Sequence, residues 1–399
     1  MIYVDASPAV HLKAGLGRYA EDLIGALKAQ GVPLTAFYHD AAKARPSPLI
    51  KSLPQLATAQ TPYPWRLRAL IAQLLGLSQD DLFEKAKYKR QKTESPSLPI
   101  SSSLHLFHAT EHLLPRFKKT KSVFTLHDLI FKFFPQHHLP RNRIFLSLAM
   151  PLFLRRADAI ICVSEHTQRD AIKLYQIDEA KTRVIYEGVH PRFKPVTDVQ
   201  VLQRAKERYN LPDKFILAVG TIEPRKNLIT LFEAFKSLIA NSQWPDLAVI
   251  VVGKQGWLFE ETFRAVHERG LTGRVKFPGF VADEDLPAVY SLAKAFAFPS
   301  VYEGFGFPPL EAMACGTPVV CSNASSLPEL VGQAAILVSP SDADAWAMAL
   351  NRVLTDRGLA QDLRGRGPHQ AAKYSWDKAA TETRYVYDSV AARISAFNG

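Results

Sequence analysis

The sequence has few cysteines and no long hydrophobic run. Its 399 residues include only three cysteines, Cys162, Cys315 and Cys321, whose spacing fits neither a disulfide pattern nor a set of metal ligands. No stretch approaches the roughly 18 apolar residues that a membrane-spanning helix needs, and the start "MIYVDASPAV" lacks the basic and apolar segments of a secretion signal. We therefore expect buried cysteines and a cytoplasmic protein.

Acidic residues are scarce in the first half of the chain. The formal net charge is +11, and residues 1–199 hold 28 of the 49 lysines and arginines against 17 acidic residues, whereas residues 200–399 are balanced. A positive field over one domain favours an anionic partner such as nucleic acid, a phospholipid surface or a phosphorylated substrate, although a basic surface also serves solubility.

The length predicts two domains, because a single hydrophobic core stops growing at roughly 250 to 300 residues. Short apolar runs alternate with amphipathic stretches in both halves, which is typical of parallel sheets covered by helices on both faces. The alternation loosens near "EGVHPRFKPVTD" and restarts at "KFILAVG". We predict two doubly wound α/β domains over residues 1–195 and 196–370, followed by a helical tail over residues 371–399. Ligands of such sheets bind beyond the carboxyl ends of the strands.

Two loops of the second half contain the residues that indicate chemistry. In "GTIEPRKN", Arg225 and Lys226 follow a strand and precede a helix, where an anion such as a diphosphate is favoured, although surface cations show the same pattern. In "AFAFPSVYEGFGFPPLE", a buried strand leads into a glycine turn, with Glu303 before the turn and Glu311 in the next helix. Two such carboxylates suit sugar hydroxyls, although Glu311 alone also suits a helix N-terminus.

Together these segments resemble a known enzyme family. "GTIEPRKN", "VKFPGFVADEDLPAVYSLA" and "SVYEGFGFPPLEAMACGTPVV" are similar to segments of the retaining nucleotide-sugar glycosyltransferases of family 4, and the two glutamates match that family's E-x7-E motif. The resemblance covers essentially the whole chain. It implies the GT-B fold, in which two Rossmann-like domains face a cleft and the C-terminal helix crosses back to the first domain. "TLHDLIF" and "GLGRY" are most similar to mannosyltransferase-type members that build bacterial polysaccharides.

The resemblance implies roles for residues of the second domain. Arg225 and Lys226 would hold the donor diphosphate and offset charge on the departing nucleotide. Glu311 would bind the ribose, and Glu303 would lie beside the donor sugar. Further contacts to the sugar, the phosphate or the base would come from Phe280, Val281, Gly304, Phe305, Gly306 and Phe307.

The resemblance also implies roles in the first domain. Gly15 and Gly17 would let backbone amides approach the donor phosphate and the acceptor. His127, which follows a strand, would hydrogen-bond the donor sugar or accept a proton from the acceptor, and Asp128 would steady it. A histidine in the core is the alternative, since the chain has 12. Weaker candidates for the acceptor side are His108 and Glu111, and Glu165 either lines the cleft or begins a helix.

No metal ion or cofactor is expected. An Asp-x-Asp sequence at residues 342–344 precedes an amphipathic run, which is typical of a capped helix. Arg225, Lys226 and a helix N-terminus supply the positive charge, so no divalent ion is required for catalysis. The resemblance implies a nucleotide-sugar donor, with GDP-mannose preferred, and a glycan or lipid-diphosphate-linked glycan as acceptor.

The basic first half has two interpretations. "PWRLRALIAQLLGL" and "EKAKYKRQK" would form an interfacial helix and a polybasic segment on the inner face of the cytoplasmic membrane, or else a helix packed on the first domain and a solvated loop. Three rival functions follow from the same observations. They are a nucleotide-sugar epimerase on the same fold, a phosphorylase with lysine-bound pyridoxal phosphate, and a nucleic-acid-binding protein, whose basic residues would need interleaved aromatics that are absent here.

Overall fold

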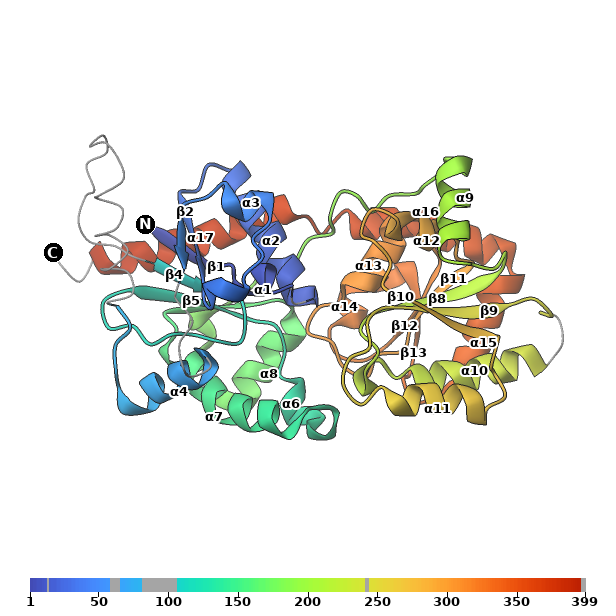
Figure 1. Ribbon diagram of the computed structural model, residues 1–399, viewed down its shortest axis with the longest axis horizontal. Helices are drawn as coiled ribbons and strands as arrows, with labels where there is room; N and C mark the ends of the chain where they lie inside the picture. Colours follow the sequence, from blue (N-terminus) through green and yellow to red (C-terminus); the bar gives the residue numbers. More distant parts are fainter. Residues whose placement is uncertain (13, 58–64, 81–105, 241–243, 396–399) are drawn as a thin grey trace. The chain divides into compact units, whose positions relative to one another are not determined.

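The chain forms two compact units, which we describe separately. The computed structural model describes residues 1–12, 14–57, 65–80, 106–240 and 244–395 (Figure 1). The first unit contains residues 1–129, 141–188 and 376–399, and the second contains residues 130–140 and 189–375. The chain passes from the first unit to the second near residue 188 and returns to the first near residue 375. The sequence predicted these boundaries at residues 195 and 370. Residues 130–140 also belong to the second unit.

The first unit is built on a parallel sheet of seven strands in the order β3-β2-β1-β4-β5-β6-β7. The strands are β1 (Ile2–Asp5), β2 (Leu34–Tyr38), β3 (Gln55–Ala57), β4 (Leu106–Ala109), β5 (Lys121–Leu126), β6 (Ala159–Cys162) and β7 (Thr182–Val184). The apolar runs predicted the strands except β3, which has only three residues and contains no apolar run. The central strands are buried throughout, because helices cover both faces.

The helices of this unit lie on the two faces of the sheet. They are α1 (Ser7–Val10), α2 (Ala14–Ala29), α3 (Pro48–Lys51), α4 (Trp65–Leu75), α7 (Pro140–Arg156), α8 (Glu165–Tyr175) and α17 (Trp376–Ser395), with 3-10 turns at Ala41–Lys43 and Glu179–Lys181. Figure 1 shows α2 and α17 on one face of the sheet and α7 and α8 on the other. The predicted helical tail over residues 371–399 contains α17, which follows a break after α16 (Arg357–Ala371).

A buried polar network fastens α17 to the sheet. His108 is fully buried, and its Nδ1 lies 2.6 Å from the Tyr387 hydroxyl of α17. Its Nε2 lies 2.7 Å from the hydroxyl of Thr125, which also contacts the Tyr19 hydroxyl of α2 at 2.9 Å. Burial lowers the pKa of His108 to about 3, and nearby His127 adds to this effect. His108 is therefore a core residue, whereas the sequence had suggested that it contacts an acceptor.

The second unit has a parallel sheet of six strands in the order β10-β9-β8-β11-β12-β13. The strands are β8 (Phe215–Val219), β9 (Ala248–Val252), β10 (Val275–Gly279), β11 (Ala295–Phe298), β12 (Val319–Ser322) and β13 (Ala335–Val338), all at runs that the sequence predicted. The helices are α6 (Ile130–Phe133), α9 (Val199–Arg208), α10 (Leu228–Ala240), α11 (Glu260–Glu268), α12 (Leu286–Leu292), α13 (Phe307–Ala314), α14 (Leu327–Val331), α15 (Ala343–Thr355) and α16, with 3-10 turns at Pro135–His137, Pro224–Lys226 and Gly332–Ala334.

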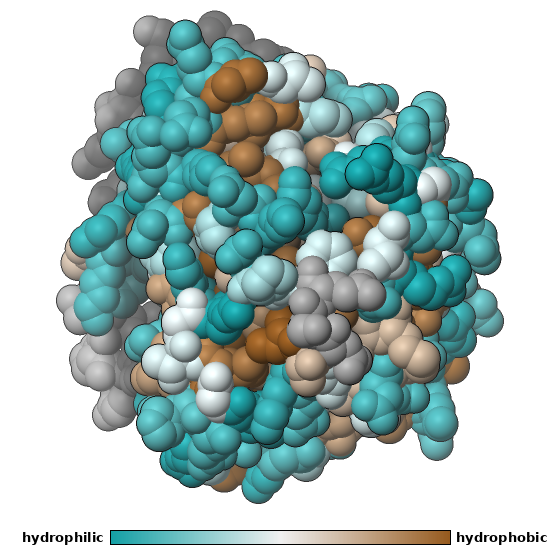
Figure 2. Space-filling view, turned by 90° about the vertical axis from the view of Figure 1, so that its right-hand side faces the viewer, coloured by the Kyte–Doolittle hydropathy of each residue, from teal (hydrophilic) through white to brown (hydrophobic). Residues whose placement is uncertain are grey.

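Helices cover both faces of this sheet. Figure 1 shows α10 and α11 on one face and α12 and α13 on the other. The face drawn in Figure 2 is mostly hydrophilic, with hydrophobic residues in small groups.

All three cysteines are buried and free, as predicted. Within the described residues, no helix combines the length and the hydropathy needed to cross a membrane.

A close backbone contact joins the carboxyl ends of β8 and β9. The amide of Gly220 donates to the carbonyl of Val252 at 2.9 Å, and the amide of Gly253 donates to the carbonyl of Gly279 at 2.9 Å. Gly253 has φ +153°, and a Cβ atom there would overlap the carbonyl oxygen of Gly220. Only glycine allows the two strand ends to approach this closely.

We predict that Gly253→Ala lowers the free energy of unfolding by about 3 kcal/mol, because it adds both a backbone clash and backbone strain. The urea midpoint would measure the change. Gly365→Ala is the matched control, because Gly365 is exposed within α16 and a Cβ there has open space. The control should be neutral or more stable by up to about 1 kcal/mol. Equal midpoints for Gly253→Ala and the wild type would contradict the contact.

Candidate active site

Asn227 connects the loop after β8 to two other strand-end loops. Arg225 and Lys226 lie on a 3-10 turn, and Asn227 follows with φ 53° before α10 begins. The side-chain amide of Asn227 donates to the carbonyls of Pro299 at 3.1 Å and Pro340 at 2.6 Å. These carbonyls follow β11 and β13, so Asn227 ties three strand-end loops together.

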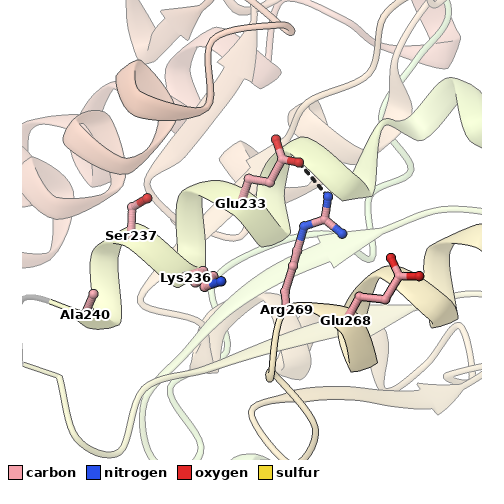
Figure 3. A pocket seen from close by; sticks show the side chains of 6 residues that line it. All are labelled: Glu233, Lys236, Ser237, Ala240, Glu268 and Arg269. Carbon is pink, nitrogen blue, oxygen red and sulfur yellow. Dashed lines mark hydrogen bonds and ion pairs between the residues drawn. The ribbon is translucent and has the colours of Figure 1, made fainter.

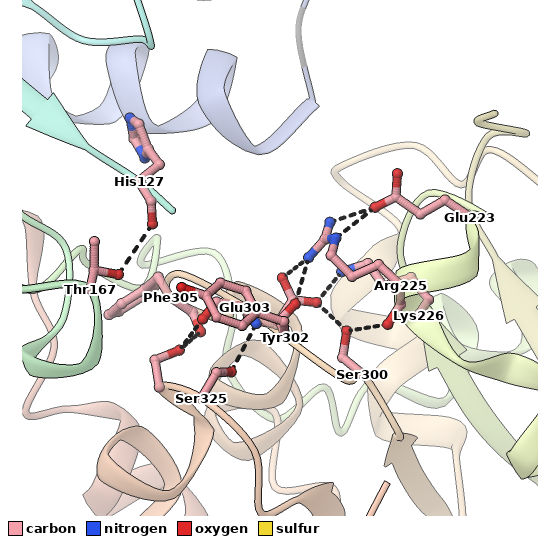
Figure 4. Close-up of polar contacts among 11 residues, drawn as sticks. His127, Thr167, Glu223, Arg225, Lys226, Ser300, Tyr302, Glu303, Phe305 and Ser325 are labelled. Carbon is pink, nitrogen blue, oxygen red and sulfur yellow. Dashed lines mark hydrogen bonds and ion pairs between the residues drawn. The ribbon is translucent and has the colours of Figure 1, made fainter. Parts of the chain in front are cut away.

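Arg225, Lys226 and Glu303 form one cluster (Figure 4). Lys226 Nζ donates to Glu303 Oε1 at 2.7 Å, and Arg225 is ion-paired with the other carboxylate oxygen. The hydroxyl of Ser300 donates to Glu303 Oε1 at 2.5 Å. Glu303 is only 8% exposed. Its carboxylate therefore accepts from three donors in a largely dry site.

A second acidic residue completes the cluster. Arg225 Nε and one terminal nitrogen donate to Glu223 Oε1 at 3.0 and 2.5 Å. Glu223 Oε2 is buried and has no hydrogen-bond partner among the described residues. Two cations thus face two carboxylates, and one acceptor oxygen remains unused. Glu223 is not among the residues that the sequence predicted, although it stands in the same strand-end loop as Arg225.

The charges of the cluster shift each other's titration. Burial alone would raise the pKa of Glu303, but the charges of Arg225 and Lys226 and the hydrogen bonds outweigh it, so the net shift is downward. Burial and the charge of Arg225 lower the pKa of Lys226, and the two glutamates oppose that shift in part. Lys226 Nζ also lies 4.7 Å from the centre of the Phe298 ring. Both charged forms are therefore fixed in position by protein groups.

The glycine turn between the two glutamates is rigid. The amide of Glu303 donates to Ser325 Oγ at 2.8 Å, and the hydroxyl of Ser326 donates to the carbonyls of Glu303 at 3.0 Å and Phe305 at 2.6 Å. Gly306 has φ 144° and immediately precedes α13. The two serines, which the sequence analysis missed, hold the turn in one conformation.

The second glutamate has different surroundings. Glu311 lies on α13, is 1% exposed, and accepts a hydrogen bond from the Tyr290 hydroxyl at 2.9 Å. The two carboxylates of the motif are therefore not a paired acid and base.

Of the predicted base-pocket residues, Val281 is buried and Phe280 is exposed, with Lys254 Nζ 5.2 Å from the centre of the Phe280 ring.

In the first unit, His127 lies at the carboxyl end of β5 with both ring nitrogens engaged. Nε2 lies 2.9 Å from the carbonyl oxygen of Thr110, and Nδ1 lies 3.2 Å from Glu187 Oε1. A carbonyl can only accept, so Nε2 holds a proton, and the imidazole and the carboxylate share a further proton at Nδ1. The ring is 7% exposed and contacts the edge of Tyr19 at 4.7 Å between centres. In this arrangement His127 has no lone pair for an acceptor proton, which argues against a general base.

Glu187 pairs with His127. Burial raises the pKa of Glu187, and the hydrogen bond with His127 opposes that shift in part. His112 Nε2 instead accepts from the backbone amides of His127 at 3.2 Å and Asp128 at 3.5 Å. The role predicted for Asp128 stays a prediction. Glu187 follows β7 in "VIYEGV", so the rule that functional residues follow strands would have found it.

The remaining candidates of the first unit have local roles. Gly15 and Gly17 lie in the first turns of α2 and not in the expected loop, and Gly17 packs against the carbonyl of Pro8 in α1. Glu165 begins α8 and pairs with exposed Arg169 at 3.5 Å.

Glu111 belongs to a buried acidic pair near the end of β4. It is 2% exposed and lies 3.7 Å from His39 Nε2. Burial and, to a lesser extent, the negative charge of Glu111 raise the pKa of Asp5 to about 6. Glu111 thus lies at the carboxyl edge of the first sheet, but in the interior.

A second feature of this unit is a groove on its outer surface. A groove lined by Glu233, Lys236, Ser237, Ala240, Glu268 and Arg269 lies between α10 and α11 (Figure 3). Arg269 and Glu233 form an ion pair across the groove at 2.5 Å. The groove lies toward the C-terminal ends of α10 and α11, away from the loops that follow the strands. Asp342 accepts from the amide of Ala345 at 2.9 Å and caps α15, as predicted. In the part of the chain that the structure describes, no group of three or more metal-ligating side chains occurs.

Comparison with known proteins agrees with this geometry. The chain is 29% identical over 385 residues to O-antigen chain mannosyltransferase B of Escherichia coli, which covers 95% of this chain and 97% of that protein. It is 35% identical over 264 residues to the serotype-specific mannosyltransferase WbdA of Escherichia coli, but spans only 32% of that protein. The match covers 65% of this chain.

The fold also matches solved glycosyltransferase structures. Sucrose-phosphate synthase (tll1590) from Thermosynechococcus elongatus has a TM-score of 0.75 at 24% identity, over 98% of this chain and 99% of that chain. Anabaena Alr3699/HepE in complex with UDP-glucose has a TM-score of 0.69 at 19% identity, over 97% and 99%. The family model "Glycosyltransferase Family 4" matches residues 14–193, and "Glycosyl transferases group 1" matches residues 200–370. The chain therefore belongs to the GT-B glycosyltransferases, with a family 4 first half and a group 1 second half.

Proposed function

We propose that this glycosyltransferase transfers a mannosyl group from GDP-mannose, with retention and without a metal ion, to a glycan or lipid-linked glycan in polysaccharide or O-antigen biosynthesis. The observation that supports transfer from a nucleotide sugar is the cluster of Arg225, Lys226 and Glu303 at the strand ends. The choice of mannose rests on the relatives, five of which are named as O-antigen chain or serotype-specific mannosyltransferases.

The cluster suits the binding of a diphosphate by exchange of ion pairs. In the structure Arg225 and Lys226 are neutralised by Glu303 and Glu223. An incoming diphosphate would take over the two cations, and the carboxylate of Glu303 would then be available to sugar hydroxyls. The same fixed cations would stabilise the negative charge that develops on the leaving nucleoside diphosphate.

The proton of the acceptor needs a destination other than His127. In the proposed reaction the bond from the anomeric carbon to the phosphate oxygen breaks, and the acceptor oxygen bonds to the same face of that carbon. The acceptor proton passes to an oxygen of the leaving diphosphate. This choice is supported by the engagement of both nitrogens of His127 with Thr110 and Glu187.

A lipid-linked acceptor would bring the enzyme to the inner face of the cytoplasmic membrane. The polybasic segment "EKAKYKRQK" that the sequence suggested for this contact lies outside the described residues. The interfacial helix of the sequence prediction is α4, whose Leu67, Ile71, Leu74 and Leu75 are exposed.

The direct test is transfer with purified enzyme and GDP, UDP, ADP and dTDP sugars. We expect turnover with GDP-mannose only when an acceptor is present, and a 100- to 1000-fold loss of kcat in Arg225→Ala and in Lys226→Ala, by analogy with loss of one preorganised donor. Lys236→Ala, in the outer groove, is the matched control and should behave as the wild type. Near-normal turnover of both single variants would refute the assignment, and conversion of the donor without acceptor would indicate an epimerase.

Exchange of ion pairs predicts opposite effects of Glu303→Gln on binding and turnover. The substitution removes one negative charge from a balanced cluster, so we expect GDP to bind about tenfold more tightly, which corresponds to roughly 1.4 kcal/mol. Turnover should fall at least 100-fold, since the sugar contact is lost. Calorimetry and initial rates would measure the two effects. Weaker binding of GDP would show that Glu303 does not compete with the diphosphate.

If Glu187 positions His127, two substitutions of Glu187 should differ in their effects on turnover and stability. Glu187→Gln keeps a hydrogen bond to His127 and should lower kcat less than about tenfold, whereas Glu187→Ala leaves a buried nitrogen unpaired and should cost about 2 kcal/mol of stability. Neither variant should change the pH dependence of kcat/KM between pH 6 and 8. If His127 were the general base, Glu187→Gln would instead displace the acidic limb of that profile.

A further inference from the structure

A small basic pocket lies at the edge of the first sheet where β5 begins. It has a volume of about 150 Å³ and is formed mainly by residues 114–122 together with Arg156 and Asp158. In a parallel sheet the strands begin at the edge opposite to the one where they end, so this pocket belongs to the other edge from His127. Four cations line it: Arg116, Lys118, Lys121 and Arg156.

The charge of the pocket is only partly balanced. Its one acidic residue, Asp158, is engaged by Lys121 Nζ at 3.0 Å and by the amide of Ser122 at 2.9 Å. Arg116 has no ion pair with any described residue, and its Nε is buried without a hydrogen-bond partner. Burial, with the charges of Arg116 and Arg155, lowers the pKa of Arg156. The pocket thus holds adjacent guanidinium groups with an unused donor.

The loop that forms the pocket is fixed before any ligand arrives. The carboxylate of Asp80 accepts from the backbone amides of Lys118 at 2.8 Å, Lys119 at 3.1 Å and Thr120 at 3.0 Å. Hydrogen bonds from Ser78 and these amides outweigh burial and lower the pKa of Asp80 to about 2. Arg156 donates to the carbonyl of Gln73 in α4 at 2.9 Å. The cations are therefore positioned by the fold.

Exposed leucines adjoin the pocket. Gly76, at the C-terminal end of α4, lies close to the guanidinium group of Arg116. Around it Leu74, Leu75 and Leu77 are 64%, 68% and 54% exposed. Leu67, Ile71 and Leu74 repeat at helical spacing, so α4 presents an apolar face that continues to the pocket.

We propose that this pocket binds the phosphate of an anionic phospholipid while the exposed leucines of α4 enter the acyl region of the bilayer. The volume suits a phosphate-sized group, since pockets for larger ligands are typically 300 Å³ or more. Cations beside an apolar helix face match the combination of charge and hydrocarbon that an anionic bilayer presents. A nucleic acid would match the cations but not the leucines. The proposal does not depend on the identity of the donor or the acceptor.

Flotation with vesicles tests the proposal on the full chain. We expect the wild type to float with vesicles of 30% phosphatidylglycerol in phosphatidylcholine, not with phosphatidylcholine alone, and to be released by 0.5 M salt in part. Arg116→Gln should weaken binding at least fivefold, the effect of about one basic contact. Leu74→Ser should weaken it as well. Lys214→Gln, a cation of the second unit, is the matched control and should bind as the wild type.

Further measurements separate the alternatives. Arg116→Gln should keep its melting temperature and its turnover with a water-soluble acceptor, so a defect in flotation cannot be confused with misfolding or with failure of the proposed transfer. Equal flotation of Arg116→Gln and the wild type would overturn the proposal, because contact elsewhere would then suffice. Tight binding of glycerol 3-phosphate, with flotation unaffected by Leu74→Ser, would assign the pocket to a free anion. Binding to an oligonucleotide in competition with vesicles would assign it to nucleic acid.

Discussion

All strands in each sheet run parallel, and this constraint determines where polar side chains can gather. The loops that leave a parallel sheet meet at one edge, so residues far apart in the sequence become neighbours there. Asn227 illustrates the effect, because its side chain bonds loops that follow β11 and β13 while lying itself after β8. The same constraint places Thr110, His127 and Glu187 together in the first unit, after β4, β5 and β7.

The cluster in the second unit is stable because its charges compensate each other. A buried cation or carboxylate is costly unless it is paired and hydrogen-bonded. Lys226 and Glu303 satisfy both conditions, since Ser300 and Arg225 supply the further contacts. The ion-pair exchange that we propose depends on this arrangement, because it leaves the two cations already desolvated and oriented.

In the first unit, hydrogen bonds between uncharged side chains satisfy the buried polar groups that connect the helices to the sheet. Tyr387, His108, Thr125 and Tyr19 form a chain of contacts from α17 through the sheet to α2. The Tyr19 ring then contacts His127, whose own nitrogens bind Thr110 and Glu187. Each buried polar group in this chain has a partner, which avoids the cost of an unsatisfied donor or acceptor. His127 is consequently a part of the framework at the sheet edge.

The sequence by itself determined the strands, apart from β3, and the two-unit α/β architecture, because apolar runs and glycine turns are local properties. It could not determine which acid pairs with His127, since Asp128 is adjacent along the chain whereas Glu187 comes from another strand end. Nor could it show that Glu311 bonds Tyr290 in the interior, that His108 belongs to the core, or that residues 130–140 join the second unit. These outcomes depend on which side chains the fold packs together, because protonation, burial and pairing are set by neighbours in space and not by neighbours in sequence.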